Sequence, residues 1–276
     1  LGQIQVIKTS EGYSSVNGLP AGTPLSGAIF AVYDKQNNVV DKFQTNENGI
    51  GSSKKLPLGI YTVKEVQAPA NYGLNPTVFT ADIEFAGQVV KLNVTDPVIT
   101  AGVSIKKTGY AQTMNNNIMR WTVSGVRNDS TTSLQSFYWR DTLPTDAVRL
   151  TRLVTGTYST TQTYKVTFTT NLNSQWRTAY DNLSTAKNYT LDMSSAALGL
   201  ASNEYVTQFM LSFGIVPAGF HHLTNATVDA QTLYALTNGY KFTNKADVGG
   251  LLGGNWVQSI ARWTTSIYSH YVPAKP

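Results

Sequence analysis

Apolar and polar residues alternate along most of this 276-residue chain, in short segments that are separated by turn-forming residues. A period of two is typical of β-strands, whose side chains point alternately to the two faces of a sheet. Turn signals such as residues 46–49 (NENG) and 56–59 (LPLG) recur at a spacing that is typical of an antiparallel sandwich or barrel. The pattern predicts strands at residues 2–8, 27–33, 38–44, 60–66, 77–84, 88–96, 103–109, 117–126, 136–141, 147–154, 163–170, 204–213 and 239–248.

The strand pattern is interrupted after Pro97, and residues 98–102 are interpreted as a linker. We therefore expect two domains, residues 1–98 and residues 99–276, in a chain that is longer than one typical domain. Minor helix is predicted at residues 191–200 and 228–238, the second ending at an Asn-Gly pair. Residues 249–254 (GGLLGG) are predicted to form a loop, because the Lys and Ser/Thr of a phosphate-binding loop do not follow them.

Three strands of the first domain carry an apolar face that ends in a charged residue. Lys8, Glu65 and Asp96 stand at these positions, each in phase with the apolar residues of its strand. A single lysine at a strand end often reaches water with its amine. Three such charges together need another explanation, because buried ions are costly unless they are closely paired. The apolar residues in phase with them are Ile4, Val6, Tyr61, Val63, Val90, Leu92 and Val94.

These three residues suggest covalent chemistry. Burial lowers the pKa of a lysine and raises that of a carboxyl group, so a neutral amine can meet a protonated acid. The Lys8 amine can then attack the Asp96 carboxyl carbon, while Glu65 polarises the carbonyl and transfers protons, and an amide crosslink remains when water leaves. Asn93 is the alternative acceptor, although its position in the alternation points outward.

The strings "QIQVIKTS", "PLSGAIFAVYD", "LPLGIYTVKEVQAPANYG" and "VTDPV" resemble the collagen-adhesin B-type (Cna-B) domain of Gram-positive surface proteins and pilins. The resemblance implies a prealbumin-like sandwich with a self-formed isopeptide bond between a lysine and an Asn or Asp, promoted by a glutamate. Carried over by motif, Lys8 is the donor, Glu65 the promoter and Asp96 the acceptor.

The second domain repeats this arrangement of faces. Lys107, Asp141 and Asn244 each continue the apolar face of their strand. Considered singly, Asp141 suits the start of a turn before Thr-Leu-Pro, and Asn244 suits a hydrogen-bonded turn position. The strings "VSIKKTG", "FYWRDTLP" and "YKFTNKADV" resemble the larger A-type (Cna-A) and related pilin domains. That resemblance implies Lys107 as donor, Asp141 as promoter and Asn244 as acceptor, with Lys106 as the alternative donor.

The composition excludes several classes of function. The chain has no Cys and only three His, so disulfides, thiolate chemistry and a His-rich metal site are not expected, and no cofactor is expected. Its net charge of +5 comes from scattered residues, which disfavours nucleic-acid binding. No apolar run approaches the ~20 residues of a membrane span. Without a catalytic motif, no enzyme activity is expected beyond formation of the crosslinks themselves.

Trp176, Trp256 and Trp263 lie among polar residues of the second domain. They are interpreted as core residues, with a sugar-binding platform as the alternative. No signal peptide opens the chain, and it contains neither a Leu-Pro-x-Thr-Gly sorting signal nor a pilin motif. We expect a piece of a longer extracellular protein, anchored to the cell wall through a C-terminal region outside this sequence.

The predicted fold is all-β, with two tandem immunoglobulin-like or prealbumin-like β-sandwiches, the second larger and with minor helix. The predicted function is a structural stalk or pilin segment that joins other pilin subunits or the cell wall through flanking regions. The alternative is an adhesive tip module, whose second domain binds a host matrix protein or a glycan.

Overall fold

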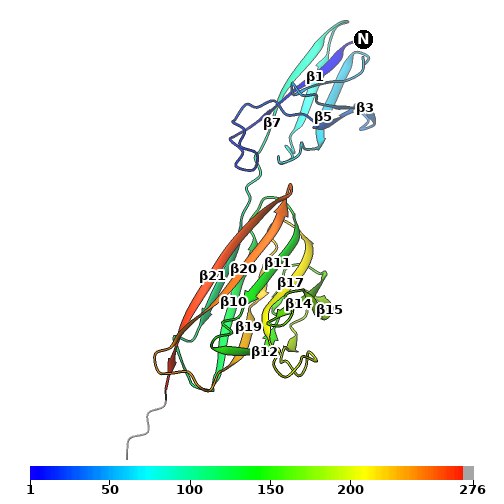
Figure 1. The fold of residues 1–276 in the computed structure, drawn as a ribbon. Helices are drawn as coiled ribbons and strands as arrows, with labels where there is room; N and C mark the ends of the chain where they lie inside the picture. The colour runs from blue at the N-terminus through cyan, green and yellow to red at the C-terminus, as the bar shows by residue number, and fades with distance from the viewer. Residues whose placement is uncertain (270–276) are drawn as a thin grey trace, which may run out of the picture. The chain divides into compact units, whose positions relative to one another are not determined.

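The computed structural model describes residues 1–269, and they form two compact units, Leu1–Ala101 and a second that begins at Gly102. Every regular element in this range is a β-strand (Figure 1). The all-β prediction is therefore confirmed, and the predicted minor helix is wrong.

The first unit is a sandwich of two sheets. Its strands are β1 (Gln3–Ser10), β2 (Ile29–Tyr33), β3 (Val39–Gln44), β4 (Ile50–Ser52), β5 (Gly59–Gln67), β6 (Val78–Ile83) and β7 (Val89–Asp96). One sheet has the order β4-β1-β7 and the other the order β3-β2-β5-β6. β1 and β7 are parallel, whereas the remaining pairs are antiparallel. The alternating apolar residues of both sheets meet in a core that includes Ile4, Val6, Phe30, Val32, Val63, Ile83 and Val94.

The second unit has a five-stranded and a seven-stranded sheet, plus a two-stranded ribbon. Their orders are β16-β12-β19-β10-β8, β15-β14-β17-β11-β20-β21-β9 and β13-β18. In Figure 1 the long strands β21, β20, β11 and β17 run side by side. The strands are β8 (Val103–Gly109), β9 (Gln112–Met114), β10 (Ile118–Asn128), β11 (Leu134–Thr142), β12 (Val148–Val154), β13 (Thr157–Tyr158), β14 (Thr163–Thr170), β15 (Arg177–Ser184), β16 (Thr190–Asp192), β17 (Val206–Val216), β18 (His222–Thr224), β19 (Ala226–Thr232), β20 (Lys241–Leu252) and β21 (Asn255–Tyr268).

Both predicted helices are replaced by strands and turns. Residues 228–232 belong to β19, which pairs with β10 on one side and with β12 on the other, and turns follow up to residue 238. Val228 and Ala230 face the core, whereas Asp229 lies on the opposite face between Arg120 and Arg152. Residues 191–200 begin in β16 and continue as turns. Pairing with neighbouring strands thus outweighs a weak local preference for helix.

The predicted loop at residues 249–254 is wrong over most of its length. β20 runs through Gly249 and Gly250, and only Gly253-Gly254 forms the turn into β21. A Cβ atom on Gly249 would lie 2.9 Å from the Tyr138 ring, and one on Gly250 would lie 2.8 Å from Leu134 Cβ. These glycines therefore allow β20 to pass close to side chains of β11, which explains glycine in the middle of a strand.

Candidate functional site

Lys8, Glu65 and Asp96 meet in the core of the first unit. β1 and β7, which carry Lys8 and Asp96, are neighbours in one sheet, and β5 brings Glu65 from the facing sheet. The Lys8 amine contacts both Asp96 Oδ1 and Glu65 Oε2. All three side chains are fully screened from solvent. The amine also lies 5.5 Å from the centre of the Phe30 ring, so its surroundings are otherwise apolar.

Burial is the largest cause of the raised pKa of Glu65, which is about 7. The neighbouring Asp96 carboxyl also raises this pKa, whereas the Lys8 amine lowers it. Asp96 Oδ2 is buried, and no hydrogen bond to it is made within residues 1–269. Two carboxyl groups next to one amine would leave an excess negative charge if all three ionised, so a shared proton is the less costly arrangement. The centre can therefore hold an amine beside a protonated acid.

The sequence reasoning missed Asn75, which orients Glu65. The Asn75 backbone N–H donates to Glu65 Oε1 at 3.1 Å, and its side-chain amide donates to the carbonyl oxygen of Thr95 at 2.8 Å. Asn75 thus ties the segment after β5 to β7, next to Asp96. Its position before Pro76 is a turn signal, but nothing in the alternation links it to Glu65. Asn93, the alternative acceptor, is exposed on the opposite face of β7.

Lys107, Asp141 and Asn244 meet in the core of the second unit. Lys107 lies on β8 in the five-stranded sheet, whereas Asp141 on β11 and Asn244 on β20 come from neighbouring strands of the seven-stranded sheet. Lys107 Nζ lies 2.5 Å from Asp141 Oδ2. The Asn244 amide donates to Asp141 Oδ1 at 2.8 Å and to the carbonyl oxygen of Thr142 at 3.1 Å. Asp141 therefore contacts both the amine and the amide.

This second centre is also dry. Asp141 and Asn244 are 0% exposed, and burial lowers the pKa of Lys107, against the opposing effect of Asp141. The Lys107 amine lies 5.6 Å from the centre of the Trp121 ring. Asn244 Oδ1 is buried, and within residues 1–269 it accepts no hydrogen bond. Lys106, the alternative donor, is exposed.

Within residues 1–269, no group of three or more His, Asp or Glu side chains is placed to hold a metal ion. The same range contains no helix that is long and apolar enough to cross a membrane.

The comparisons with known proteins agree with the fold of the first unit. Residues 3–98 match the family model of the SpaA prealbumin-like fold domain. This part of the chain is a prealbumin-like SpaA domain. A stretch of 69 residues is 41% identical to the trypsin-resistant surface T6 protein of Streptococcus pyogenes serotype M6, and it covers 25% of this chain and 13% of that protein. The chain therefore matches only a small part of that surface protein.

Solved structures of pilins align with this chain at low sequence identity and low TM-score. The major pilin BcpA of Bacillus cereus aligns over 96% of this chain and 68% of its own, with 15% identity and a TM-score of 0.31. The major pilin SpaD of Corynebacterium diphtheriae aligns over 96% of this chain and 65% of its own, with 16% identity and a TM-score of 0.28. Because these TM-scores are low, the function of the SpaA domain and of the second unit is inferred from their residues.

Proposed function

We propose that this chain is a load-bearing segment of a Gram-positive pilin or wall-anchored surface protein, and that each unit is closed by its own lysine isopeptide bond. The observation that carries the proposal is the presence of two separate buried centres. In the first centre the Lys8 amine contacts the carboxyl groups of both Glu65 and Asp96. In the second the Lys107 amine contacts Asp141, which also accepts a hydrogen bond from the Asn244 amide. Buried lysine–carboxyl centres of this kind are costly as permanent ion pairs, and an amide removes the charges.

In the first unit the bond forms between Lys8 Nζ and Asp96 Cγ. The neutral amine attacks the protonated carboxyl, the C–OH bond breaks, and one water molecule leaves. Glu65, in contact with the amine, gives a proton to the departing hydroxyl and recovers one from the lysine nitrogen. The raised pKa of Glu65, about 7, suits a group that both gives and takes a proton near neutral pH.

In the second unit the bond forms between Lys107 Nζ and Asn244 Cγ. The amine attacks the amide carbon, the bond from Cγ to Nδ2 breaks, and ammonia leaves. Asp141 contacts Lys107 Nζ through Oδ2 and Asn244 Nδ2 through Oδ1. It can thus take a proton from the attacking amine and deliver one to the leaving nitrogen. The lowered pKa of Lys107 favours the neutral, nucleophilic amine.

The mass of the intact, unfolded chain tests this proposal. Loss of one water and one ammonia predicts a mass about 35 Da below the mass calculated from the unmodified amino-acid sequence. We expect Glu65→Gln to restore about 18 Da and Asp141→Asn to restore about 17 Da, because each removes the proton-transferring group of one bond. Lys8→Ala and Lys107→Ala should do the same.

Peptide mapping then locates the bonds. After digestion we expect one branched peptide that joins Lys8 to Asp96 and another that joins Lys107 to Asn244. A folded chain at the mass of its sequence would contradict both bonds. Linear peptides that contain an unmodified Lys8 or Lys107 would contradict the bond concerned.

A further inference from the structure

An open groove of about 770 Å³ lies on the outer face of the seven-stranded sheet in the second unit. Phe137 and Trp139 of β11 point into the core, so Tyr138 and Arg140, which alternate with them, point out of the sheet into the groove. β14, β17 and β21 add further outward-facing side chains, and residues around β15 form one wall. A volume of this size is typical of sites for small ligands.

Two tryptophans present their rings to solvent in this groove. Trp176 is 39% exposed and Trp256 is 52% exposed. Tyr138 also lines the groove, with its ring centre 5.7 Å from that of Trp256 and the two ring planes at 75°. Of the three tryptophans interpreted above as core or sugar platform, only Trp263 packs against the core, and it donates its indole N–H to the carbonyl oxygen of Tyr110.

The aromatic floor is fixed in position before any ligand arrives. The Tyr138 hydroxyl donates to Asp247 Oδ2 at 2.9 Å and accepts a hydrogen bond from Gln258 Nε2 at 2.9 Å. Arg140 forms two hydrogen bonds to the same Asp247, at 2.9 and 2.8 Å. The missing side chain of Gly249 leaves the space that the Tyr138 ring occupies. Preorganisation of this kind lowers the entropy lost on binding.

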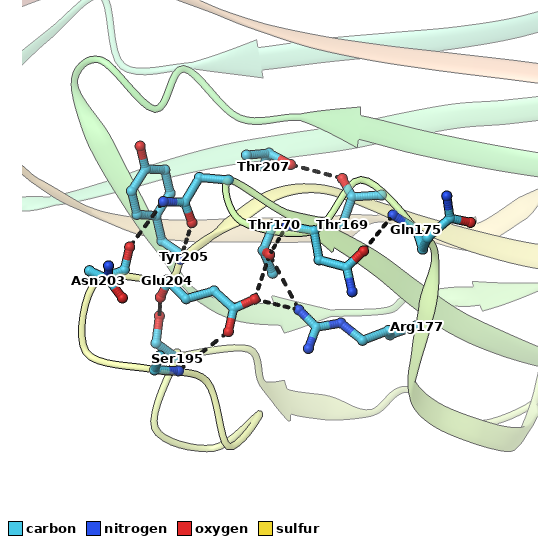
Figure 2. A network of polar contacts seen from close by, with 12 residues as sticks. Thr169, Thr170, Gln175, Arg177, Ser195, Asn203, Glu204, Tyr205 and Thr207 are labelled. Carbon is cyan, nitrogen blue, oxygen red and sulfur yellow. Dashed lines mark hydrogen bonds and ion pairs between the residues drawn. The ribbon is translucent and has the colours of Figure 1, made fainter.

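Two features of the backbone and its polar contacts position lining residues of the groove. The register of β11 shifts around Ser136, a lining residue with a φ of 48° that a non-glycine residue rarely adopts. Gln175 and Arg177, the sequence neighbours of Trp176, belong to the polar network that Figure 2 shows. Gln175 donates its backbone N–H to Asn173 Oδ1 at 2.9 Å, and Arg177 pairs with Glu204 at 2.7 Å.

The chemistry of the lining indicates the ligand. The charged groups balance, since Arg140 pairs with Asp247 and the groove is further lined by one lysine and one aspartate, Lys165 and Asp181. The other polar groups are neutral hydroxyls and amides, from Ser136, Thr163, Asn182, Ser212 and Gln258. A ligand that suits this groove has no net charge, an apolar face for the indoles, and an edge rich in hydroxyl groups.

We propose that this groove binds a neutral oligosaccharide. Pyranose rings combine a face of C–H groups, which packs on tryptophan, with hydroxyl groups that bond to amides and hydroxyls. An acidic glycan would leave its carboxylates facing a groove without excess positive charge. Binding here does not depend on the lysine crosslinks, so failure of either proposal leaves the other standing.

The test titrates the whole chain with a panel of neutral oligosaccharides built from hexose, N-acetylhexosamine and deoxyhexose units, following tryptophan fluorescence and ligand NMR signals. Sialyllactose, a hyaluronan tetrasaccharide and a collagen-like peptide serve as comparators. We expect a neutral member of the panel to bind, and Trp176→Ala and Trp256→Ala each to weaken its affinity by about tenfold or more. Both residues are exposed, so neither change should unfold the protein. Tyr234→Ala is the matched control, because Tyr234 is 82% exposed and does not line the groove.

Three outcomes would overturn the proposal. One is the absence of binding by every neutral oligosaccharide in the panel. Another is binding that the two tryptophan variants leave unchanged, which would place the ligand elsewhere on the protein. The third is binding of only the acidic glycans or the collagen-like peptide, which would assign the groove to a different class of partner.

Discussion

Each of the two lysine centres combines a lysine with two carboxyl or amide side chains, but the two centres distribute these residues differently over their sheets. In the first unit Lys8 and Asp96 lie on neighbouring strands of one sheet, and Glu65 faces them from the other. In the second unit Asp141 and Asn244 share a sheet, and Lys107 faces them from the other. The residue on the opposite sheet is thus the proposed promoter, Glu65, in one unit and the proposed donor, Lys107, in the other. What the centres share is three inward-facing positions on three strands, two of them in the same sheet.

This difference changes what each proposed bond would hold together. A bond between β1 and β7 joins the first and last strands of the SpaA domain within one sheet. A bond between β8 and β20 joins the two sheets of the second unit and leaves β21 outside the closed loop. β21 is held by hydrogen bonds to β20 and, near its end, to β9. Force applied to both ends of the chain would therefore be borne by the proposed covalent bond in each unit. In the second unit β21 would first have to detach from its neighbouring strands.

Force spectroscopy on the whole chain tests this difference and has the largest expected effect. In the first unit we expect only the residues before Lys8 to extend, because the residues from Lys8 to Asp96 lie within the loop that the proposed bond closes. The second unit should release residues 245–269, a contour of about 85 Å at 3.3–3.6 Å per residue. In Asn244→Ala the step should grow by several hundred ångströms, because the residues between Lys107 and position 244 then extend as well. A full-length step from the unaltered first unit would contradict its bond.

Loss of either crosslink should lower stability by a similar amount in the two units. The chain-entropy model for a closed loop gives about 5 kcal/mol for Lys8→Met and for Lys107→Met, since the loops have similar lengths on a logarithmic scale. Urea unfolding of each variant measures the change. Lys91→Met and Lys241→Met are matched controls, because both lysines are exposed on β7 and β20, the strands of the two proposed acceptors. An effect no larger than that of the controls would contradict the crosslink in that unit.

The rates of bond formation should depend on pH in opposite directions. Glu65 has a raised pKa of about 7, so its protonated fraction falls about tenfold between pH 6 and pH 8, and the rate in the first unit should fall with it. Burial lowers the pKa of Lys107, so its neutral fraction rises with pH, and the rate in the second unit should rise. Protein dissolved from inclusion bodies in acidic urea and diluted into each buffer gives both rates by mass spectrometry. A common pH profile for the two units would contradict this assignment.

Much of the two centres could be predicted from sequence because their strands alternate cleanly. One buried face per strand is enough to select Lys8, Glu65 and Asp96 from their neighbours. The same reasoning missed β21, in which both faces carry polar and apolar residues, so no period of two stands out. It also predicted helix at β19, where Asp229 lies on the face away from the core and pairs with the partly exposed Arg120 and Arg152. Alternation shows which way a side chain points, but not which strand lies beside it, so neither Asn75 nor the groove could be predicted.

The rival residues give the smallest expected effect and the most direct test of face selection. Lys106 adjoins Lys107, and Asn93 lies three residues before Asp96, yet both point out of their sheets and are exposed. Lys106→Ala and Asn93→Ala should keep the full mass deficit and change stability by less than about 0.5 kcal/mol. Intact mass and urea unfolding measure both. If either change removes a crosslink, the reacting residue is not determined by the face of the strand on which it lies. The inference that inward-facing residues form both centres would then be wrong.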